Sequence, residues 1–195
     1  MYSMATRDMH DISNNRYGSG RDALLKATIE IVGQQGLHGL TFRAVADLAN
    51  VNNSLVSYHF GNKDSLLREA AHWAVSYAIR LSDFSELLNQ SDNFAESLVK
   101  FVESDPNLHL FQYEFILESR RRPELRREAE TLYETYIDAL EKVLLHHGHI
   151  NCRSLARAVF AALDGLIFQQ LTISDSKTIQ KAICCIGELV KRDSA

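Results

Sequence analysis

The stretch from Thr41 to Lys63, TFRAVADLANVNNSLVSYHFGNK, constrains the fold of this chain more than any other part of the sequence. Its apolar residues recur at helical spacing in two short segments separated by Asn50, a residue that tolerates the left-handed backbone of a tight turn. The side chains expected to point inward are Val45, Leu48, Ala49, Val51, Val56 and Phe60. Those expected to face outward on the second segment are Asn53, Leu55, Ser57, Tyr58 and His59. Two short helices with one small core and a polar outer face predict a helix-turn-helix module that reads DNA.

The segments that flank this module also have helical patterns with recognisable ends. An apolar stripe runs from Arg21 to Gln35, and Gly36 follows where the end of a helix often needs a positive φ. Thr41 suits the N-cap of the next helix, and Asn62 suits the N-cap of a fourth helix that begins at Lys63.

The rest of the sequence predicts helices only. Amphipathic patterns cover residues 92–104, a segment from Pro106, and residues 123–148, 153–172 and 177–192. We therefore predict an all-α fold of about nine helices, with an N-terminal three-helix helix-turn-helix domain and a C-terminal helical ligand-binding and dimerisation domain. The expected divisions are a mobile N-terminal arm (1–20), the DNA-binding domain (21–66), a connecting fourth helix (67–84) and the effector-binding and dimerisation domain (85–195). Arg16 in the arm and Arg21 directly after it could reach a flanking groove or phosphate of the DNA. The alternative is that the arm has no role.

Composition argues against several other classes of protein. No apolar run approaches the roughly 18 residues of a membrane span, and the N-terminus lacks the apolar segment of a secretory signal. Three cysteines, two of them adjacent, do not form a disulfide pattern, so we expect a cytoplasmic protein that does not associate with membranes. Phosphate-binding loops and catalytic motifs are not found in the sequence, so no enzyme activity, cofactor or metal is expected.

The charge distribution limits how the module can hold DNA. The net charge is −4, and residues 1–64 hold six Arg or Lys and six Asp or Glu. The DNA-reading part is therefore neutral. We expect few phosphate contacts and a modest dependence of binding on salt.

Three motifs carry a resemblance to a known family: GLHGLT, RAVADLANV and YHFGNKDSLL. With them, residues 21–70 resemble the tetracycline-repressor-like (TetR) family of bacterial transcription regulators. The resemblance implies a base contact from Arg43 and phosphate contacts from Thr41, Tyr58, His59 and Lys63. Many members of the family carry Thr and Tyr where this chain has Leu55 and Ser57, so the operator sequence cannot be taken from the family.

The residue types on the second helix suit base edges in the major groove. Asn53 can present both amide groups to an adenine, and Ser57, one turn later, can donate or accept a hydrogen bond. Leu55 can contact a thymine methyl group. We therefore predict base contacts from Arg43, Asn53, Leu55 and Ser57.

One module covers too few base pairs for specific binding, so we expect a homodimer that reads a palindrome in double-stranded DNA. The last two helices are apolar on more than one face, which suits a helical-bundle interface. The predicted interface residues are Phe160, Leu163, Leu166, Ile167, Leu171, Ile183, Ile186 and Val190.

Aromatic and polar side chains in the middle of the chain are candidates for an effector pocket. They are Phe101, His109, Phe111, Gln112, Phe115, Tyr133, Tyr136, Phe168 and Gln169, with Phe94 and Tyr113 in the same set. A small apolar or aromatic effector bound there would tilt the fourth helix and release the operator, so the leading hypothesis is a ligand-responsive repressor.

Two alternatives remain open. The first is a helical small-molecule-binding protein or enzyme that keeps the helix-turn-helix only as a scaffold. The second is a regulator that responds to a protein partner, and a pocket filled by its own side chains would favour it.

Overall fold

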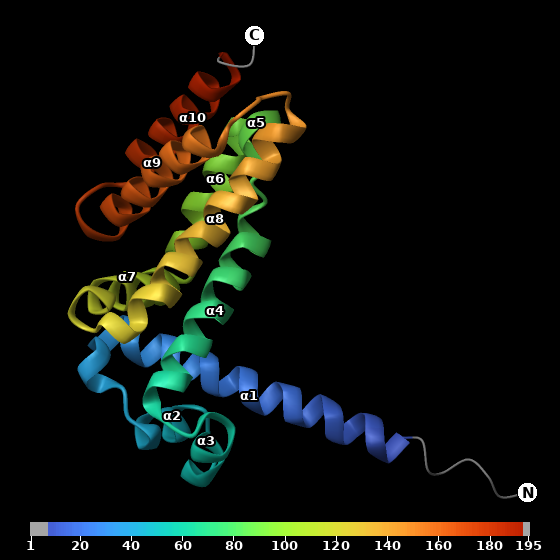
Figure 1. Cartoon of the computed structure of the whole chain (residues 1–195), viewed down its shortest axis with the longest axis vertical. Helices are drawn as coiled ribbons and strands as arrows, with labels where there is room; N and C mark the ends of the chain where they lie inside the picture. Colours follow the sequence, from blue (N-terminus) through green and yellow to red (C-terminus); the bar gives the residue numbers. More distant parts are fainter. Residues whose placement is uncertain (1–7, 193–195) are drawn as a thin grey trace, which may run out of the picture.

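A computed structural model describes the backbone of residues 8–192 and the side chains from residue 20 onward (Figure 1). The described residues form α-helices and two short 3-10 helices, with no strand, which confirms the all-α prediction. Nine helices are longer than one turn, and the tenth, α5, has four residues. The α-helices are α1 (Asp8–Gln35), α2 (Phe42–Leu48), α3 (Asn53–Phe60), α4 (Lys63–Ser82), α5 (Glu86–Asn89), α6 (Ser91–Ser104), α7 (Pro106–Arg121), α8 (Arg126–His146), α9 (Arg153–Thr172) and α10 (Ser176–Arg192). The 3-10 helices are η1 (Leu37–Gly39) and η2 (Pro123–Leu125).

The ends of the short helices follow the capping residues predicted from the sequence. The Thr41 hydroxyl accepts a hydrogen bond from the backbone N–H of Ala44 at 3.0 Å, at the start of α2. The Asn62 side chain accepts from the N–H of Ser65 at 2.9 Å, at the start of α4. Asn50 occupies the turn between α2 and α3 with φ 53°. These contacts satisfy N–H groups that the first helical turn leaves free, and they fix where α2 and α4 begin.

The core of the helix-turn-helix agrees with the sequence pattern at all but one position. Val45 and Val56 are fully buried and Phe60 is nearly so, whereas Leu48 is 53% exposed. The prediction that Leu48 points inward is therefore wrong. The helix α2 ends at Leu48, and the next residue, Ala49, packs against the core in its place.

The first helix begins earlier than the sequence predicted. We expected a helix from Arg21, but α1 begins at Asp8, because residues 8–20 contain no proline and a nucleated helix extends at little cost. Figure 1 shows this part of α1 projecting away from the other helices. Residues 1–7 of the predicted arm and the side chain of Arg16 lie outside the described residues. The Arg21 side chain pairs with Glu69 and lies over the ring of Phe60, so it takes part in packing within the DNA-binding part.

The helix α4 connects the helix-turn-helix to the rest of the chain. It begins beside α3 and runs toward the other half of the molecule, where it packs on α6, α7 and α8. Farther from α3, α9 and α10 lie side by side (Figure 1). The helix α1 packs against α7, and the two backbones approach closely at Gly33, where a Cβ atom would lie 2.6 Å from the carbonyl oxygen of Asn107. No helix within residues 8–192 is long and apolar enough to cross a membrane.

Two details of the C-terminal part differ from the sequence pattern. Pro123 does not begin the long helix but a separate 3-10 helix, after which α8 starts at Arg126. The short helix α5 was not predicted, because four residues are too few to show a helical period.

Candidate DNA-reading surface and effector cavity

The helix α3 presents a polar outer face. Asn53 and Ser57 are exposed, and Tyr58 is 74% exposed at the end of the same face. Leu55 is only partly exposed, because it packs against the core. Asn53 and Ser57 are thus free to reach a base edge, whereas Leu55 can offer only part of its side chain to a thymine methyl group.

The predicted phosphate-contacting residues lie on α3 and at the starts of the two helices next to it, α2 and α4. Thr41 and Lys63 are exposed at the starts of α2 and α4, and His59 is partly exposed near the end of α3. The Lys63 ammonium group donates to the carbonyl oxygen of Leu40 at 3.5 Å, which holds it over the N-terminal side of α2. Two helix N-termini and an ammonium group next to α3 form a surface that suits an anion.

Arg43 extends into solvent from the first turn of α2. Its guanidinium lies 3.8 Å from the carboxylate of Asp47, and both side chains are mostly exposed. An exposed pair of this kind contributes less than about 1 kcal/mol, so Arg43 can leave Asp47 for a base or phosphate at little cost.

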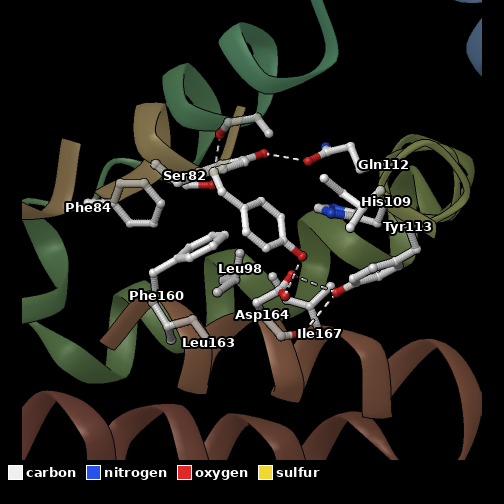
Figure 2. Close-up of a pocket in the computed structure, with 14 residues that line it drawn as sticks. Ser82, Phe84, Leu98, His109, Gln112, Tyr113, Phe160, Leu163, Asp164 and Ile167 are labelled. Atoms are coloured by element: carbon white, nitrogen blue, oxygen red, sulfur yellow. Dashed lines mark hydrogen bonds between the residues drawn. The ribbon is translucent and has the colours of Figure 1, made fainter. Parts of the chain in front are cut away.

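A cavity lies between α4, α6, α7, α8 and α9 (Figure 2). It encloses about 40 Å³, which is room for about three waters. Its walls are Ala78, Ser82, Phe84, Leu98, His109, Gln112, Tyr113, Ile116, Tyr133, Tyr136, Phe160, Leu163, Asp164 and Ile167. The side chains fill most of the space, so any ligand larger than a few atoms must displace them.

Four of the nine predicted pocket residues line this cavity: His109, Gln112, Tyr133 and Tyr136. The other five do not. Phe111 and Phe115 are fully buried core residues, and Phe101 packs edge-on against the His109 ring at 5.1 Å. Phe168 and Gln169 are exposed on α9.

Asp164 is the acidic group of the cavity wall, and no pattern in the sequence predicted it there. The Tyr113 hydroxyl lies 2.9 Å from the Asp164 carbonyl oxygen and 3.1 Å from its Oδ1, and shares its proton between them. The Tyr133 hydroxyl donates to Oδ2 at 3.2 Å. Burial raises the pKa of Asp164, and the two hydroxyl groups offset part of that rise because they stabilise the charged form.

Two other polar side chains in the wall, those of Gln112 and His109, each have one buried nitrogen without a hydrogen-bond partner. Gln112 accepts a hydrogen bond from the Tyr136 hydroxyl at 2.8 Å, but its Nε2 is buried without a partner. The Nε2 atom of His109 is likewise buried and unpartnered, and burial lowers the pKa of His109 to about 4. His109 is therefore neutral at physiological pH. Unsatisfied buried groups are costly, so both nitrogens are available to a polar group that enters the cavity.

The predicted dimer residues divide into two groups. Phe160, Leu163, Ile183 and Val190 are buried within the chain, and Phe160, Leu163 and Ile167 belong to the cavity wall. A partner cannot reach the four buried residues unless the chain opens, because α9 packs on α8 and α10 packs on α6. Leu166, Ile167, Leu171 and Ile186 are partly exposed.

The apolar residues that α9 and α10 expose are mostly different ones. Phe168 is 49% and Leu189 59% exposed, and Ala158, Ala161 and Ala162 form a row of small exposed residues on α9. The spacing of this row at i, i+3 and i+4 was visible in the sequence, but small residues give a weak hydrophobic signal.

Comparisons with known proteins agree with this architecture. The profile described as "Bacterial regulatory proteins, tetR family" matches residues 24–70. The profile described as "Tetracyclin repressor-like, C-terminal domain" matches residues 89–184.

Individual relatives extend over most of the chain. The nicotine-responsive transcriptional repressor HdnoR of Paenarthrobacter nicotinovorans is 26% identical over 160 residues, which are 76% of this chain and 82% of HdnoR. The crystal structure of a TetR-family transcriptional regulator from Rhodococcus sp. superposes with a TM-score of 0.74 at 18% identity, over 89% of this chain and 99% of the other. The multidrug binding protein EbrR, in complex with imidazole, superposes with a TM-score of 0.61 at 28% identity, over 85% of this chain and 93% of EbrR.

The exposed polar recognition helix, its capped neighbours and the buried cavity define a DNA-binding transcription regulator with a site for a ligand. The chain belongs to the tetracycline-repressor-like (TetR) family.

Proposed function

We propose that this chain is a cytoplasmic homodimeric repressor that binds a palindromic operator through α3 and releases it when a small molecule enters the cavity. The observation that carries the proposal is the course of α4. Lys63 begins this helix beside α3, and Ala78 and Ser82, near its other end, line the cavity. A ligand that displaces Ala78 or Ser82 therefore moves the element on which the DNA-reading helix rests.

The DNA contacts follow from the exposed residues of the helix-turn-helix. Asn53, Ser57 and Arg43 reach base edges, with a smaller contribution from Leu55. Thr41, Tyr58, His59 and Lys63 hold the phosphates on either side of the groove.

A dimer is needed to read two half-sites about 34–36 Å apart. The helices α9 and α10, which carry the exposed Phe168 and Leu189, lie in the half of the molecule away from α3 (Figure 1). An interface there, with the half-buried Leu166, Leu171 and Ile186 at its edges, leaves both α3 helices free for DNA.

The relatives support a response to small molecules. HdnoR is a nicotine-responsive repressor, and EbrR is a multidrug binding protein whose structure contains imidazole. The buried unpartnered groups of His109 and Gln112 support a ligand at the same site in this chain.

The test is a gel-shift titration with DNA from upstream of the protein's own coding sequence. We expect a dimer to bind at low salt and Asn53→Ala to weaken binding by about tenfold or more, since a good base contact is worth roughly 1–3 kcal/mol. Asn93→Ala, an exposed asparagine on α6, is the matched control and should bind like the wild type. If Asn53→Ala binds the DNA as tightly as the wild type, the result would favour the alternative in which the helix-turn-helix is only a scaffold.

The small size of the cavity favours one second candidate, a regulator that responds to a protein partner. Ligand pockets for drug-sized molecules measure roughly 300–1,000 Å³, whereas this cavity encloses about 40 Å³. A screen of small molecules by thermal unfolding separates the two. A compound that raises the melting temperature of the protein and lowers its affinity for the operator supports the response to a small molecule. If no compound changes operator binding, the regulator that responds to a protein partner is favoured.

A further inference from the structure

The effector cavity contains a carboxylate that has no cation beside it. Asp164 projects from α9 into the cavity, toward Tyr113 (Figure 2). None of the described residues that line the cavity is Lys or Arg, and no ion pair found among residues 20–192 includes Asp164. Removing a carboxylate from water without a counterion is costly, so such a group is rarely kept for stability alone.

The neighbours of Asp164 prepare it to receive a positive charge. The hydroxyls of Tyr113 and Tyr133 donate to its two carboxylate oxygens, at 3.1 and 3.2 Å. Burial and the charge of Asp164 raise the pKa of both tyrosines, so they stay protonated and remain donors. Two donors orient the carboxylate and stabilise its charged form, but they leave its net charge uncompensated.

Aromatic rings make up the adjoining wall. The Tyr133 ring packs edge-on against Phe160 at 5.0 Å between centroids, and the Tyr136 ring stacks on Phe160 at 5.1 Å. Phe84 closes the far side, with its centroid 6.5 Å from that of Tyr136. The faces of such rings attract cations, and the attraction is strongest where water is excluded.

The remaining polar groups favour a ligand that is not charged at both ends. His109 is neutral, and Gln112 offers only the N–H groups of its amide. Neither can balance a second charge, but each can bond to one neutral polar atom of a ligand.

We propose that the effector is a small organic amine in its protonated form, with an apolar or aromatic body, and that Asp164 is its counterion. This inference rests on the proposed function, since it concerns the same cavity. The ammonium N–H groups donate to the carboxylate of Asp164, the aromatic rings surround the cation, and Gln112 and His109 contact a neutral polar atom of the body.

The test uses three probes of one size and different charge: benzylamine, benzyl alcohol and benzoate. Binding of each to the full-length dimer is measured by calorimetry at neutral pH, without DNA. We expect benzylamine to bind about tenfold or more tightly than benzyl alcohol, since both can donate a hydrogen bond to the carboxylate but only the ammonium group also compensates its charge. Benzoate should not bind, because its charge repels Asp164.

Two variants identify the group responsible. Asp164→Asn keeps an acceptor for the tyrosine hydroxyls but removes the charge, so it should abolish the preference for benzylamine over benzyl alcohol. Asp22→Asn, the same change at an exposed position on α1, should leave the preference intact. If Asp164→Asn does not fold, the ranking of the three probes on the wild type decides alone.

The outcomes separate this inference from the proposed function. Equal or stronger binding of benzyl alcohol, retention of the preference in Asp164→Asn, or binding of none of the probes overturns the amine effector. Because the calorimetry contains no DNA, amine binding by a chain that ignores every operator would contradict the proposed function and leave the amine site standing.

Discussion

The guanidinium of Arg122, at the end of α7, lies 2.6 Å from the carboxylate of Asp64 in the first turn of α4. Arg122 also pairs with Glu124 at 3.0 Å, and these carboxylates raise its pKa further above the ordinary value. The contact joins the cavity-lining helix α7 to the residue next to Lys63. It is a direct link between a helix that lines the cavity and the start of α4, beside α3.

Replacing Arg122 should weaken this link with little effect on folding. Both side chains are about a third exposed, so the pair contributes on the order of 1 kcal/mol or less to stability. We expect Arg122→Ala to bind operator DNA nearly as well as the wild type but to respond less to the effector, measured as the change in operator affinity when effector is added. Arg126→Ala, whose partner Glu130 is on the same helix, is the control. An unchanged response in Arg122→Ala would mean that coupling follows another route.

A second connection between the halves depends on the absence of a side chain. At Gly33 on α1, an added Cβ would lie 2.6 Å from the backbone oxygen of Asn107 on α7. This distance is a steric clash, and the backbone of α1 or α7 must move to remove it. We expect Gly33→Ala to destabilise the fold by roughly 1–3 kcal/mol in urea titrations.

Gly20, on the same helix, supplies the control. A Cβ there meets nothing within 4 Å, so Gly20→Ala should raise stability by up to about 1 kcal/mol, since alanine favours the helix. Opposite signs for the two substitutions would support the close approach of α1 and α7, and equal signs would contradict it.

Salt dependence tests the proposed phosphate contacts. A contact from an ammonium group releases about 0.9 counterion, so Lys63→Ala in a dimer should reduce the slope of log K against log salt by about 2. The Lys63 ammonium is held near α2 by its bond to the Leu40 carbonyl, in a position suited to one phosphate. Lys100→Ala, an equal loss of charge on α6, should leave the slope unchanged. If Lys63→Ala and the wild type have equal slopes, Lys63 does not contact a phosphate.

The sequence identified the local features of this chain better than the contacts between its helices. Thr41, Asn50 and Asn62 were assigned correctly, because a cap or turn depends on residues within four positions of it. The cavity was predicted only in part, because a helical period reveals which face of a helix is apolar but not which helix covers it. Phe160 therefore looked like a dimer contact, and Asp164 had no recognisable partner until α7 and α8 brought two tyrosines to it.

Acid should destabilise the fold through His109. Burial lowers the pKa of His109 from the ordinary 6.5 to about 4. Between pH 6.5 and pH 4, His109 is therefore protonated in the unfolded chain but neutral in the folded chain. The stability that neutral His109 contributes is present above pH 6.5 and is lost as the pH falls toward 4, by up to about 3 kcal/mol. Urea titrations of the wild type and His109→Leu across this window measure the difference. A pH dependence that is the same in both would contradict a buried neutral histidine.

Asp164 should act on stability in the opposite direction. Because burial raises its pKa above the ordinary 3.8, the folded chain binds this proton more tightly than the unfolded chain, and stability is lost as the pH rises through the folded pKa. At neutral pH the charged carboxylate therefore costs free energy, which the two tyrosine hydroxyls only partly offset.

We therefore expect Asp164→Asn to unfold at a higher urea concentration than the wild type at neutral pH, with the difference vanishing as the pH falls below 3.8. The same variant should lose its preference for a cationic ligand. If Asp164→Asn is more stable but selects its ligand less well, then Asp164 serves ligand binding and lowers the stability of the fold. A lower urea midpoint at neutral pH would mean instead that the charge of Asp164 helps to hold α7, α8 and α9 together.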